Sequence, residues 1–240
     1  MNPRLAHLKD RHVGERGVIV ANGPSLNQMD LSFLRNETVI GMNKIFLGLK
    51  RFGFYPKYYI AINPIVVEQS VTQIRQLNCI KVLSKNAASD QVPEGSMTYL
   101  VDTKAHDCNE LGKPCPGFSR DLATNLMHEG WTVTHAALQL AYHLGFEEVV
   151  LIGLDHRYQF EGAPNEKMTM DGPDQNHFDP SYFGGGQSWH NPDLAQSEES
   201  YRLAESVFQA SGRRIIDATV GGACQIFPKQ DYRDYFGLKI

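Results

Sequence analysis

The chain has 240 residues, which is enough for one large α/β domain or two small ones and for a sizeable buried core. Apolar residues make up 42% of it and charged residues 21%, both ordinary for a globular protein, and the net charge is −4. This balance excludes a surface-wide basic field. We therefore expect no nucleic-acid partner, and a local site for any phosphate group.

The N-terminal segment, residues 1–16, is charged and lacks the apolar stretch of a secretory signal. No apolar run approaches the roughly 20 residues that span a bilayer. We therefore expect a cytoplasmic protein without an integral membrane segment. The four cysteines are scattered and form no CxxC pair, which favours free thiols over a disulfide framework or a zinc site: Cys79, Cys108, Cys115 and Cys224.

Seven short apolar runs predict buried strands, and three amphipathic stretches between them predict helices. The strands are expected at 17–21, 38–42, 58–62, 81–83, 97–101, 149–154 and 214–218. The helices are expected at 65–77, 135–144 and 194–210, the last with Asp193 as its N-cap. Strands that are apolar throughout and alternate with helices are typical of a mostly parallel sheet with helices on both faces. The sequence thus predicts a single Rossmann-like α/β domain over residues 1–240.

Two stretches interrupt this alternation. Residues 86–129 are polar and irregular, and residues 156–192 are richer still in Gly, Pro, Asp and Asn. A structureless segment of that length inside a domain is usually functional or disordered, and the aromatic side chains of 156–192 argue against disorder. We interpret residues 156–192 as a lid segment inserted into the fold. Its glycines 184–186 are either a hinge or a flexible surface turn.

Polar side chains follow several predicted strands at the point where each ends. Asn22, Asn43 and Asn63 follow the first three strands, and Asp155 follows the strand at 149–154. Ligands of open parallel sheets bind outside the carboxyl ends of the strands, so this convergence predicts a binding site there. Asn also favours turns because its side chain caps backbone groups, and that interpretation stays open.

Two further features bear on an anionic ligand. The loop at 22–26 is neither a P-loop nor a GxGxxG fingerprint, but Gly23 permits close backbone approach and Ser25 offers a hydroxyl to a phosphate or to a cap. Thr132 and Thr134 open the helix at 135–144, whose N-terminus offers an anion site. Simple N-capping by either Thr explains their positions as well.

The lid segment and the residue before it hold titratable side chains, but their spacing matches no standard zinc pattern, so we expect no metal site. They are Asp155, His156, His177, Asp179 and His190. A His near neutral pH suits a general base. The sequence leaves His190 and His177 as the candidates, with His190 preferred.

The order of these motifs resembles two families. Val-Ile-Val-Ala-Asn-Gly-Pro-Ser-Leu (18–26), Ala-Ile-Asn-Pro (61–64) and Leu-Gly-Phe-Glu-Glu-Val-Val-Leu-Ile-Gly-Leu-Asp (144–155) resemble the bacterial sialyltransferases of glycosyltransferase family 42. With Ile-Asp-Ala-Thr-Val-Gly-Gly (216–222), they resemble even more closely the 6-hydroxymethylpterin diphosphokinase MptE-like family, whose members occur in surface-polysaccharide and flagellin-glycosylation proteins.

The sialyltransferase resemblance implies roles for particular residues. It implies contacts to the nucleotide of a CMP-linked sugar from Asn22, Gly23, Ser25, Asn43 and Asn63, with Thr132 and Thr134 nearby. His190 takes the place of the base that accepts the proton of the acceptor hydroxyl. The family's tyrosines, which help the phosphate to leave, are missing here. Arg157 or Tyr158 would have to replace them in the stretch after Asp155.

The sequence therefore predicts a glycosyltransferase for surface glycan synthesis, with a nucleotide-sugar donor and a glycan acceptor as partners and no required cofactor. One alternative is an ATP- and Mg²⁺-dependent pyrophosphokinase of the pterin type, although no convincing acidic cluster is visible. Another is a non-catalytic nucleotide- or sugar-binding module. The sequence leaves the oligomeric state open, a homo-oligomer included.

Overall fold

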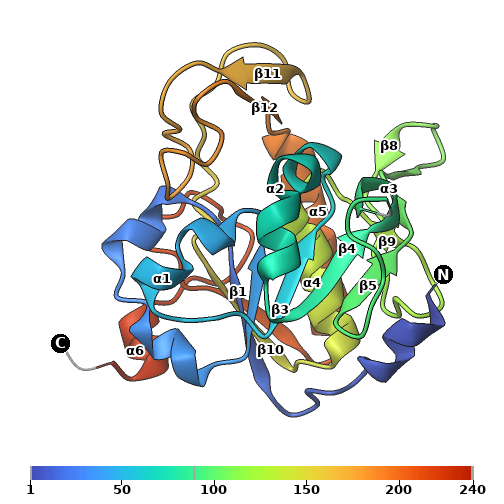
Figure 1. The fold of residues 1–240 in the computed structure, drawn as a ribbon. Helices are drawn as coiled ribbons and strands as arrows, with labels where there is room; N and C mark the ends of the chain where they lie inside the picture. Colours follow the sequence, from blue (N-terminus) through green and yellow to red (C-terminus); the bar gives the residue numbers. More distant parts are fainter. Residues whose placement is uncertain (1, 89, 239–240) are drawn as a thin grey trace.

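Seven parallel strands form one sheet in the computed structural model, which describes residues 2–88 and 90–238 (Figure 1). All seven strands predicted from the sequence are present, with ends that differ by one or two residues. The order across the sheet is β13 (Arg214–Asp217), β10 (Glu148–Ile152), β1 (Arg16–Val20), β2 (Val39–Met42), β3 (Tyr58–Ala61), β4 (Ile80–Ser84) and β5 (Thr98–Val101).

The strand order reverses beside β1. From β1 the chain steps outward through β2, β3, β4 and β5, and it then returns to place β10 on the other side of β1. Val18 of β1 lies between Val39 of β2 and Val150 of β10. A reversal of this kind opens a crevice at the carboxyl ends of the strands, which is where open α/β sheets bind ligands. The topology therefore places the crevice between the loops that follow β1 and β10.

Helices cover both faces of the sheet, as the sequence predicts. On one face lie α4 (Val133–Leu144) and α5 (Leu194–Ala210), and α2 (Pro64–Gln76) covers the other. Alternate residues of β1 serve the two cores, since Ile19 belongs to the cluster under α4 while Val18 and Val20 belong to the cluster under α2. The shorter helices are α1 (Leu49–Phe52), α3 (Lys85–Ala88) and α6 (Tyr232–Phe236).

Side-chain caps fix where the long helices begin. The Thr132 hydroxyl accepts from the backbone N–H of Thr134, so α4 starts two residues earlier than its apolar pattern predicts. Asn63 caps α2 through Ile65, and Asp193 caps α5 through Gln196, as expected from the sequence. These caps hold the first turns of α2 and α4 at the carboxyl edge of the sheet.

The two irregular stretches contain short strands of their own. Residues 86–129 include the pair β6 (Thr103–Lys104) and β9 (Met127–His128), and the hairpin β7 (Asp107–Cys108) with β8 (Pro114–Cys115). In the lid segment, β11 (Lys167–Met170) and β12 (Gln187–His190) form an antiparallel ribbon that stands above the sheet in Figure 1.

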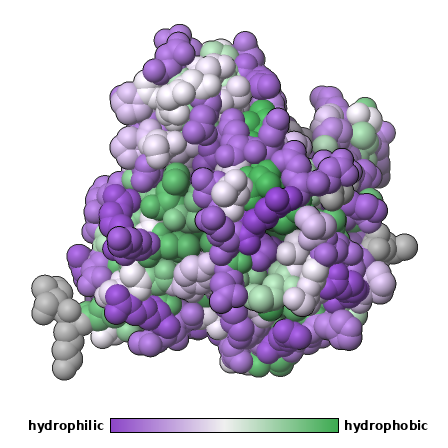
Figure 2. Space-filling model, in the orientation of Figure 1, coloured by the Kyte–Doolittle hydropathy of each residue, from purple (hydrophilic) through white to green (hydrophobic). Residues whose placement is uncertain are grey.

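The lid segment is anchored at its base by aromatic side chains. Phe178, Tyr182, Phe183 and Trp189 are buried and belong to the core cluster under α2. Figure 2 shows the projecting tip of the segment covered by polar and weakly hydropathic residues, with apolar residues gathered on the body below it. The base of the segment is thus part of the folded core, while its tip faces solvent. Among the described residues, no helix is both long and apolar enough to cross a membrane.

Candidate active site

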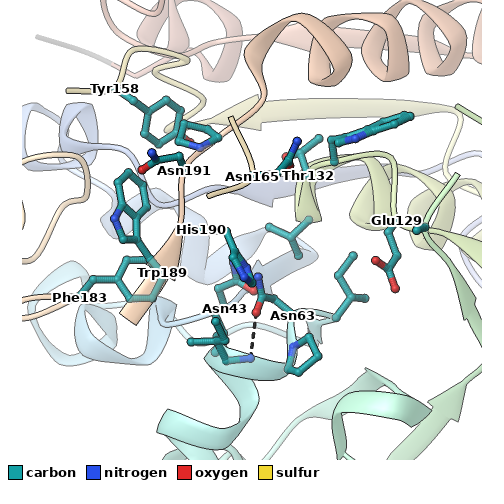
Figure 3. A pocket seen from close by; sticks show the side chains of 18 of the residues that line it. Asn43, Asn63, Glu129, Thr132, Tyr158, Asn165, Phe183, Trp189, His190 and Asn191 are labelled. Atoms are coloured by element: carbon teal, nitrogen blue, oxygen red, sulfur yellow. Dashed lines mark hydrogen bonds between the residues drawn. The ribbon is translucent and has the colours of Figure 1, made fainter. Parts of the chain in front are cut away.

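Two connected cavities lie at the carboxyl ends of the strands. The larger has a volume of about 470 Å³ and the smaller about 60 Å³. Figure 3 shows the larger cavity, with Trp189 and Phe183 of the lid segment on one side and Glu129 on the other. A cavity of several hundred Å³ suits a small organic ligand. Five junction residues line both cavities: Asn43, Thr132, Val133, Tyr158 and His177.

Asn22 lies at the floor of the smaller cavity, two residues after β1. Its side-chain Nδ2 donates to the carbonyl of Met42 at 3.2 Å, which fixes the orientation of the amide, because a flipped amide would set two acceptors against each other. Oδ1 is then buried without a hydrogen-bond partner, and the residue is only 7% exposed. Burying an acceptor without a hydrogen bond costs about 1–3 kcal/mol of stability. A ligand or a water molecule that donates a hydrogen bond to this oxygen would therefore be stabilising.

Asn43 supplies a second unpaired acceptor to the same cavity. It follows β2 directly and has a φ of +48°, a left-handed conformation that Asn tolerates better than most residues. Its Oδ1 is also buried without a partner, while its backbone carbonyl accepts from the Tyr59 hydroxyl at 2.6 Å. The two strand-end asparagines thus present two acceptors at one place.

Two helix N-termini face the cavities. Thr132, Val133 and Thr134 of the first turn of α4 line the smaller cavity, and Asn63 with the first turn of α2 lines the larger. The amide of Asn63 also caps α2, with Oδ1 accepting from Ile65 at 2.9 Å. The positive ends of two helix dipoles favour an anion between them.

Asp155 and Ser25 tie the loops after β10 and β1 together. Asp155 lines the smaller cavity, and burial raises the pKa of its carboxyl, while hydrogen bonds from Ser25 act in the opposite direction. Ser25 lines neither cavity and is 1% exposed. Between them lies Gly23, where an added Cβ would stand 1.8 Å from an Asp155 oxygen, so a side chain is excluded.

Arg157 and Tyr158 follow Asp155 into the lid segment. Arg157 is exposed and lines the smaller cavity, whereas Tyr158 is a junction residue. Burial raises the pKa of the Tyr158 hydroxyl to about 12, so it stays neutral at pH 7. Both residues therefore reach the cavities, Arg157 as a cation and Tyr158 as a neutral donor.

The two candidate bases occupy different surroundings. His190 ends β12, is exposed, and lines the larger cavity. His177 is a junction residue whose Nδ1 lies 2.8 Å from a carboxylate oxygen of Asp174, and its ring stacks on Tyr182 at 3.9 Å. His156 packs on α5 through Tyr201 and Glu198, and Asp179 caps Ser181. Neither of those two lines a cavity.

Several residues at the site are not predicted from the sequence. Asp174 is one, although its spacing of three residues from His177 is a signal that could have been noticed. Lys44 is another, a buried cation whose Nζ donates to Gln69, to Gln187 and to the Tyr182 carbonyl, and so ties the lid segment to α2. In the far wall of the larger cavity, His106 stacks on Trp131. Within the described ranges, no group of three His, Cys, Asp or Glu side chains is placed to hold a metal ion.

The fold and the site define a Rossmann-like α/β protein with a ligand crevice at the switch point of its sheet. The sequence profile of the family described as 6-hydroxymethylpterin diphosphokinase MptE-like matches residues 1–161, and the chain belongs to that family. The resemblance to it that the sequence motifs carry is therefore confirmed. No curated protein matches the chain.

One solved structure is similar, that of the MAf glycosyltransferase from Magnetospirillum magneticum AMB-1. The two share 14% sequence identity with a TM-score of 0.58, over 95% of this chain and 37% of that one. The chain thus spans well under half the length of that protein. At this identity the likeness supports the fold, which agrees with the Rossmann-like arrangement predicted from the sequence.

Proposed function

We propose that the chain is a glycosyltransferase that moves a sugar from a nucleotide-activated donor to a glycan acceptor in surface glycan synthesis. A CMP-linked, sialic-acid-like donor is favoured. The family, the name of the similar solved structure and the resemblance of the motifs to those of sialyltransferases support this proposal. One observation carries it: two unpaired acceptors, on Asn22 and Asn43, line a cavity that also meets the N-terminus of α4.

The amide oxygens of Asn22 and Asn43 and the N-terminus of α4 are expected to bind different parts of one ligand. A phosphate at pH 7 only accepts hydrogen bonds, so it suits the first turn of α4 and not the amide oxygens of Asn22 and Asn43. Those oxygens require hydroxyl or amino donors, which a ribose, a sugar or a cytosine supplies. A nucleotide-linked sugar carries both kinds of group within a few bonds. In this proposal the phosphate therefore lies against the first turn of α4, whose Thr132 and Val133 line both cavities.

In this proposal the reaction needs a base for the acceptor hydroxyl and a stabilised leaving phosphate. His190 is the base, since it lines the larger and more open cavity, where an acceptor enters. Gly23 lets the backbone approach the donor closely, and Ser25 acts indirectly by holding Asp155. No cofactor is required. The location is expected to be cytoplasmic, where nucleotide sugars are made available.

A pterin pyrophosphokinase is the second candidate because the family is described by the name of such an enzyme. Such an enzyme would hold Mg²⁺ between carboxylates and ATP phosphates. The carboxylates that line either cavity within the described residues are Asp155 and Glu129, and both already accept hydrogen bonds, from Ser25 and Thr103. A pair of free carboxylates for a metal is not assembled by these residues.

Thermal-shift measurements with CMP, CDP, UDP, ATP and a pterin, each with and without Mg²⁺, test the proposal. A true ligand at a hundredfold excess over its Kd adds about 2.7 kcal/mol to the free energy of unfolding, which is readily seen. We expect stabilisation by CMP without Mg²⁺, and release of CMP from a CMP-linked sugar. Stabilisation by ATP and pterin only with Mg²⁺ would favour the pyrophosphokinase. Binding without turnover of any sugar donor would favour a binding module.

A further inference from the structure

His177 lies in the candidate site, but the proposed reaction, with His190 as the base, gives it no role. It lines both cavities, so it lies beside the place where the bond between sugar and phosphate is expected. The side chain is 11% exposed. Its Nδ1 is joined to Asp174 at 2.8 Å, and no hydrogen bond of Nε2 is recorded within the described part of the chain. One ring nitrogen is therefore held, and the other is left for a ligand.

The ring of His177 has little freedom to turn. It stacks on Tyr182 with centroids 3.9 Å apart and an angle of 3° between the planes. Phe183 meets it edge-on at 5.3 Å, and Tyr158 does so at 6.3 Å. Packing on several sides, together with the bond to Asp174, fixes the direction of Nε2 before any ligand arrives. Such pre-organisation is what a catalytic group requires.

Asp174 is itself held as a charged group. Its side chain is fully buried, and it accepts from the backbone N–H of Asn176 at 2.8 Å and of Phe183 at 3.1 Å as well as facing His177. Burial alone would raise the pKa of the Asp174 carboxyl, but the hydrogen bonds from His177 and from these two N–H groups outweigh it and the pKa is lowered. A buried carboxylate beside Nδ1 holds the ring in the orientation in which Nδ1 donates, and it offsets positive charge on the ring during the reaction.

We propose that His177 is a catalytic residue that stabilises the departing phosphate, and that Asp174 is its positioning residue. The inference rests on the proposed glycosyltransferase function. As the acceptor oxygen bonds to the anomeric carbon, the bond from that carbon to the phosphate oxygen breaks and its electron pair stays on the phosphate. His177 donates Nε2–H to that oxygen, while the hydroxyl proton passes to His190. Charge and atoms balance without any further reactant.

The other junction residues are less suited to this task. Asn43, Thr132 and Val133 carry no charge, and Tyr158 is a neutral donor. Arg157 is a cation, but it is exposed and lines only the smaller cavity. His177 is thus the side chain shared by both cavities that can carry a proton on each of two ring nitrogens, one of which faces Asp174.

The first test needs binding alone. The imidazole of His177 is titrated by NMR in the intact chain, with CMP, with cytidine and without ligand. The groups that face it are Asp174, Tyr158 and Tyr182, with Lys44 beyond Asp174. We expect CMP to raise the pKa of His177, because its phosphate favours the imidazolium, and cytidine to leave it in place. Equal effects of CMP and cytidine, or none from either, would overturn the proposal.

The second test follows release of CMP from a CMP-linked sugar. His177→Ala should lower kcat by 10²–10⁴-fold with little change in the KM of the donor, as for other proton-donating groups. Asp174→Asn should lower kcat less and move the alkaline limb of its pH profile to lower pH. The matched control is Asp179→Asn, a carboxylate of the same segment that lines neither cavity and should leave kcat unchanged.

The outcomes distinguish the proposed role of His177 from the proposed glycosyltransferase function. If Asp174→Asn changes only the melting temperature and not the pH limb, Asp174 has a structural role and the positioning claim is wrong. If His177→Ala keeps its kcat while His190→Ala loses it, the glycosyltransferase function stands and the His177 proposal falls. If CMP raises the pKa of His177 but no donor is turned over, the phosphate contact stands and the glycosyltransferase function falls.

Discussion

Ser25 and Asp155 stand 130 residues apart in the chain, yet Asp155 accepts two hydrogen bonds from Ser25, one from its backbone N–H at 3.0 Å and one from its hydroxyl at 2.6 Å. The pair joins the loops that follow β1 and β10, the two neighbouring strands where the sheet order reverses. The floor of the crevice is thus braced by a contact between its two sides.

We expect Ser25→Ala to lower the free energy of unfolding by about 1.5–3 kcal/mol, the contribution of a hydrogen bond to a charged group. The pKa of Asp155 should rise further, because the hydroxyl no longer offsets burial. Urea unfolding and NMR titration measure the two effects. Ser181→Ala is the control, since its hydroxyl bonds to Asp179 at an exposed position. Equal losses for the two variants would contradict the bracing role.

Asn43→Gly should weaken binding of CMP by about 1–3 kcal/mol and leave the chain folded. Glycine tolerates the φ of +48°, and it removes the unpaired oxygen together with the hydrogen bond of the side chain to Tyr182. Asn43→Ala should lose binding as well, and in addition about 1 kcal/mol of stability from the left-handed backbone. Calorimetric titration and thermal unfolding separate these terms. Unchanged affinity for CMP in Asn43→Gly would remove the ligand from this cavity.

Lys44 should make stability depend on pH in the alkaline range. Burial lowers its pKa from 10.5 to about 8, so between these values the unfolded chain binds the proton more tightly than the folded chain. The free energy of unfolding should therefore rise with pH from about 8 to 10.5, by at most about 1.4 kcal/mol per pH unit from this group. Subtracting the urea-unfolding curve of Lys44→Met from that of the wild type isolates the term. If the difference between the two curves does not change with pH, the hydrogen bonds of Nζ outweigh the effect of burial on the pKa of Lys44.

His190→Ala should bind CMP normally and lose 10²–10⁴-fold in transfer to the acceptor. The side chain is exposed at the end of β12, so the fold should be unaffected. The control is Lys167→Ala, the residue paired with His190 across the ribbon. Transfer at the normal rate in His190→Ala, with loss in His177→Ala, would assign the base to His177.

Ligand should protect the exposed part of the lid segment from trypsin. Residues 159–167 are exposed, and Lys167 offers a cleavage point, whereas Phe178 and Tyr182 are 1% exposed. We expect slower cleavage after Lys167 with saturating CMP. Cleavage at an unchanged rate would show that the segment is a fixed wall and does not close.

The sequence predicts the sheet well because the strands are mostly apolar runs and a polar residue marks the end of several of them. The strand-end positions of Asn22, Asn43 and Asp155 follow directly from that pattern, and all three line the smaller cavity. Helix starts are less accurate, because the cap at Thr132 is a contact of one side chain and leaves no mark on the apolar periodicity.

The apolar pattern of the sequence does not predict contacts between residues that are far apart in the chain. Lys44 reaches Tyr182 across 138 residues, and nothing near Lys44 in the sequence marks it as buried. His177 and His190 look alike as single residues of a polar segment. Only the folded chain shows that one is clamped by Asp174 and the other is exposed. The character of each residue at the site depends on partners that the sequence does not bring together.

The lid segment enters and leaves the fold at neighbouring points. It begins at His156, whose ring contacts Glu198 and Tyr201 of α5, and it ends at Pro192, directly before α5. Because Phe178 and Tyr182 of the segment belong to the core under α2, only its exposed residues 159–167 can change in length without disturbing the strands that carry Asn22 and Asn43. If the proposed function holds, changes in that exposed part would alter the acceptor side of the larger cavity, which Asn165 lines, and would leave the lining of the smaller cavity in place.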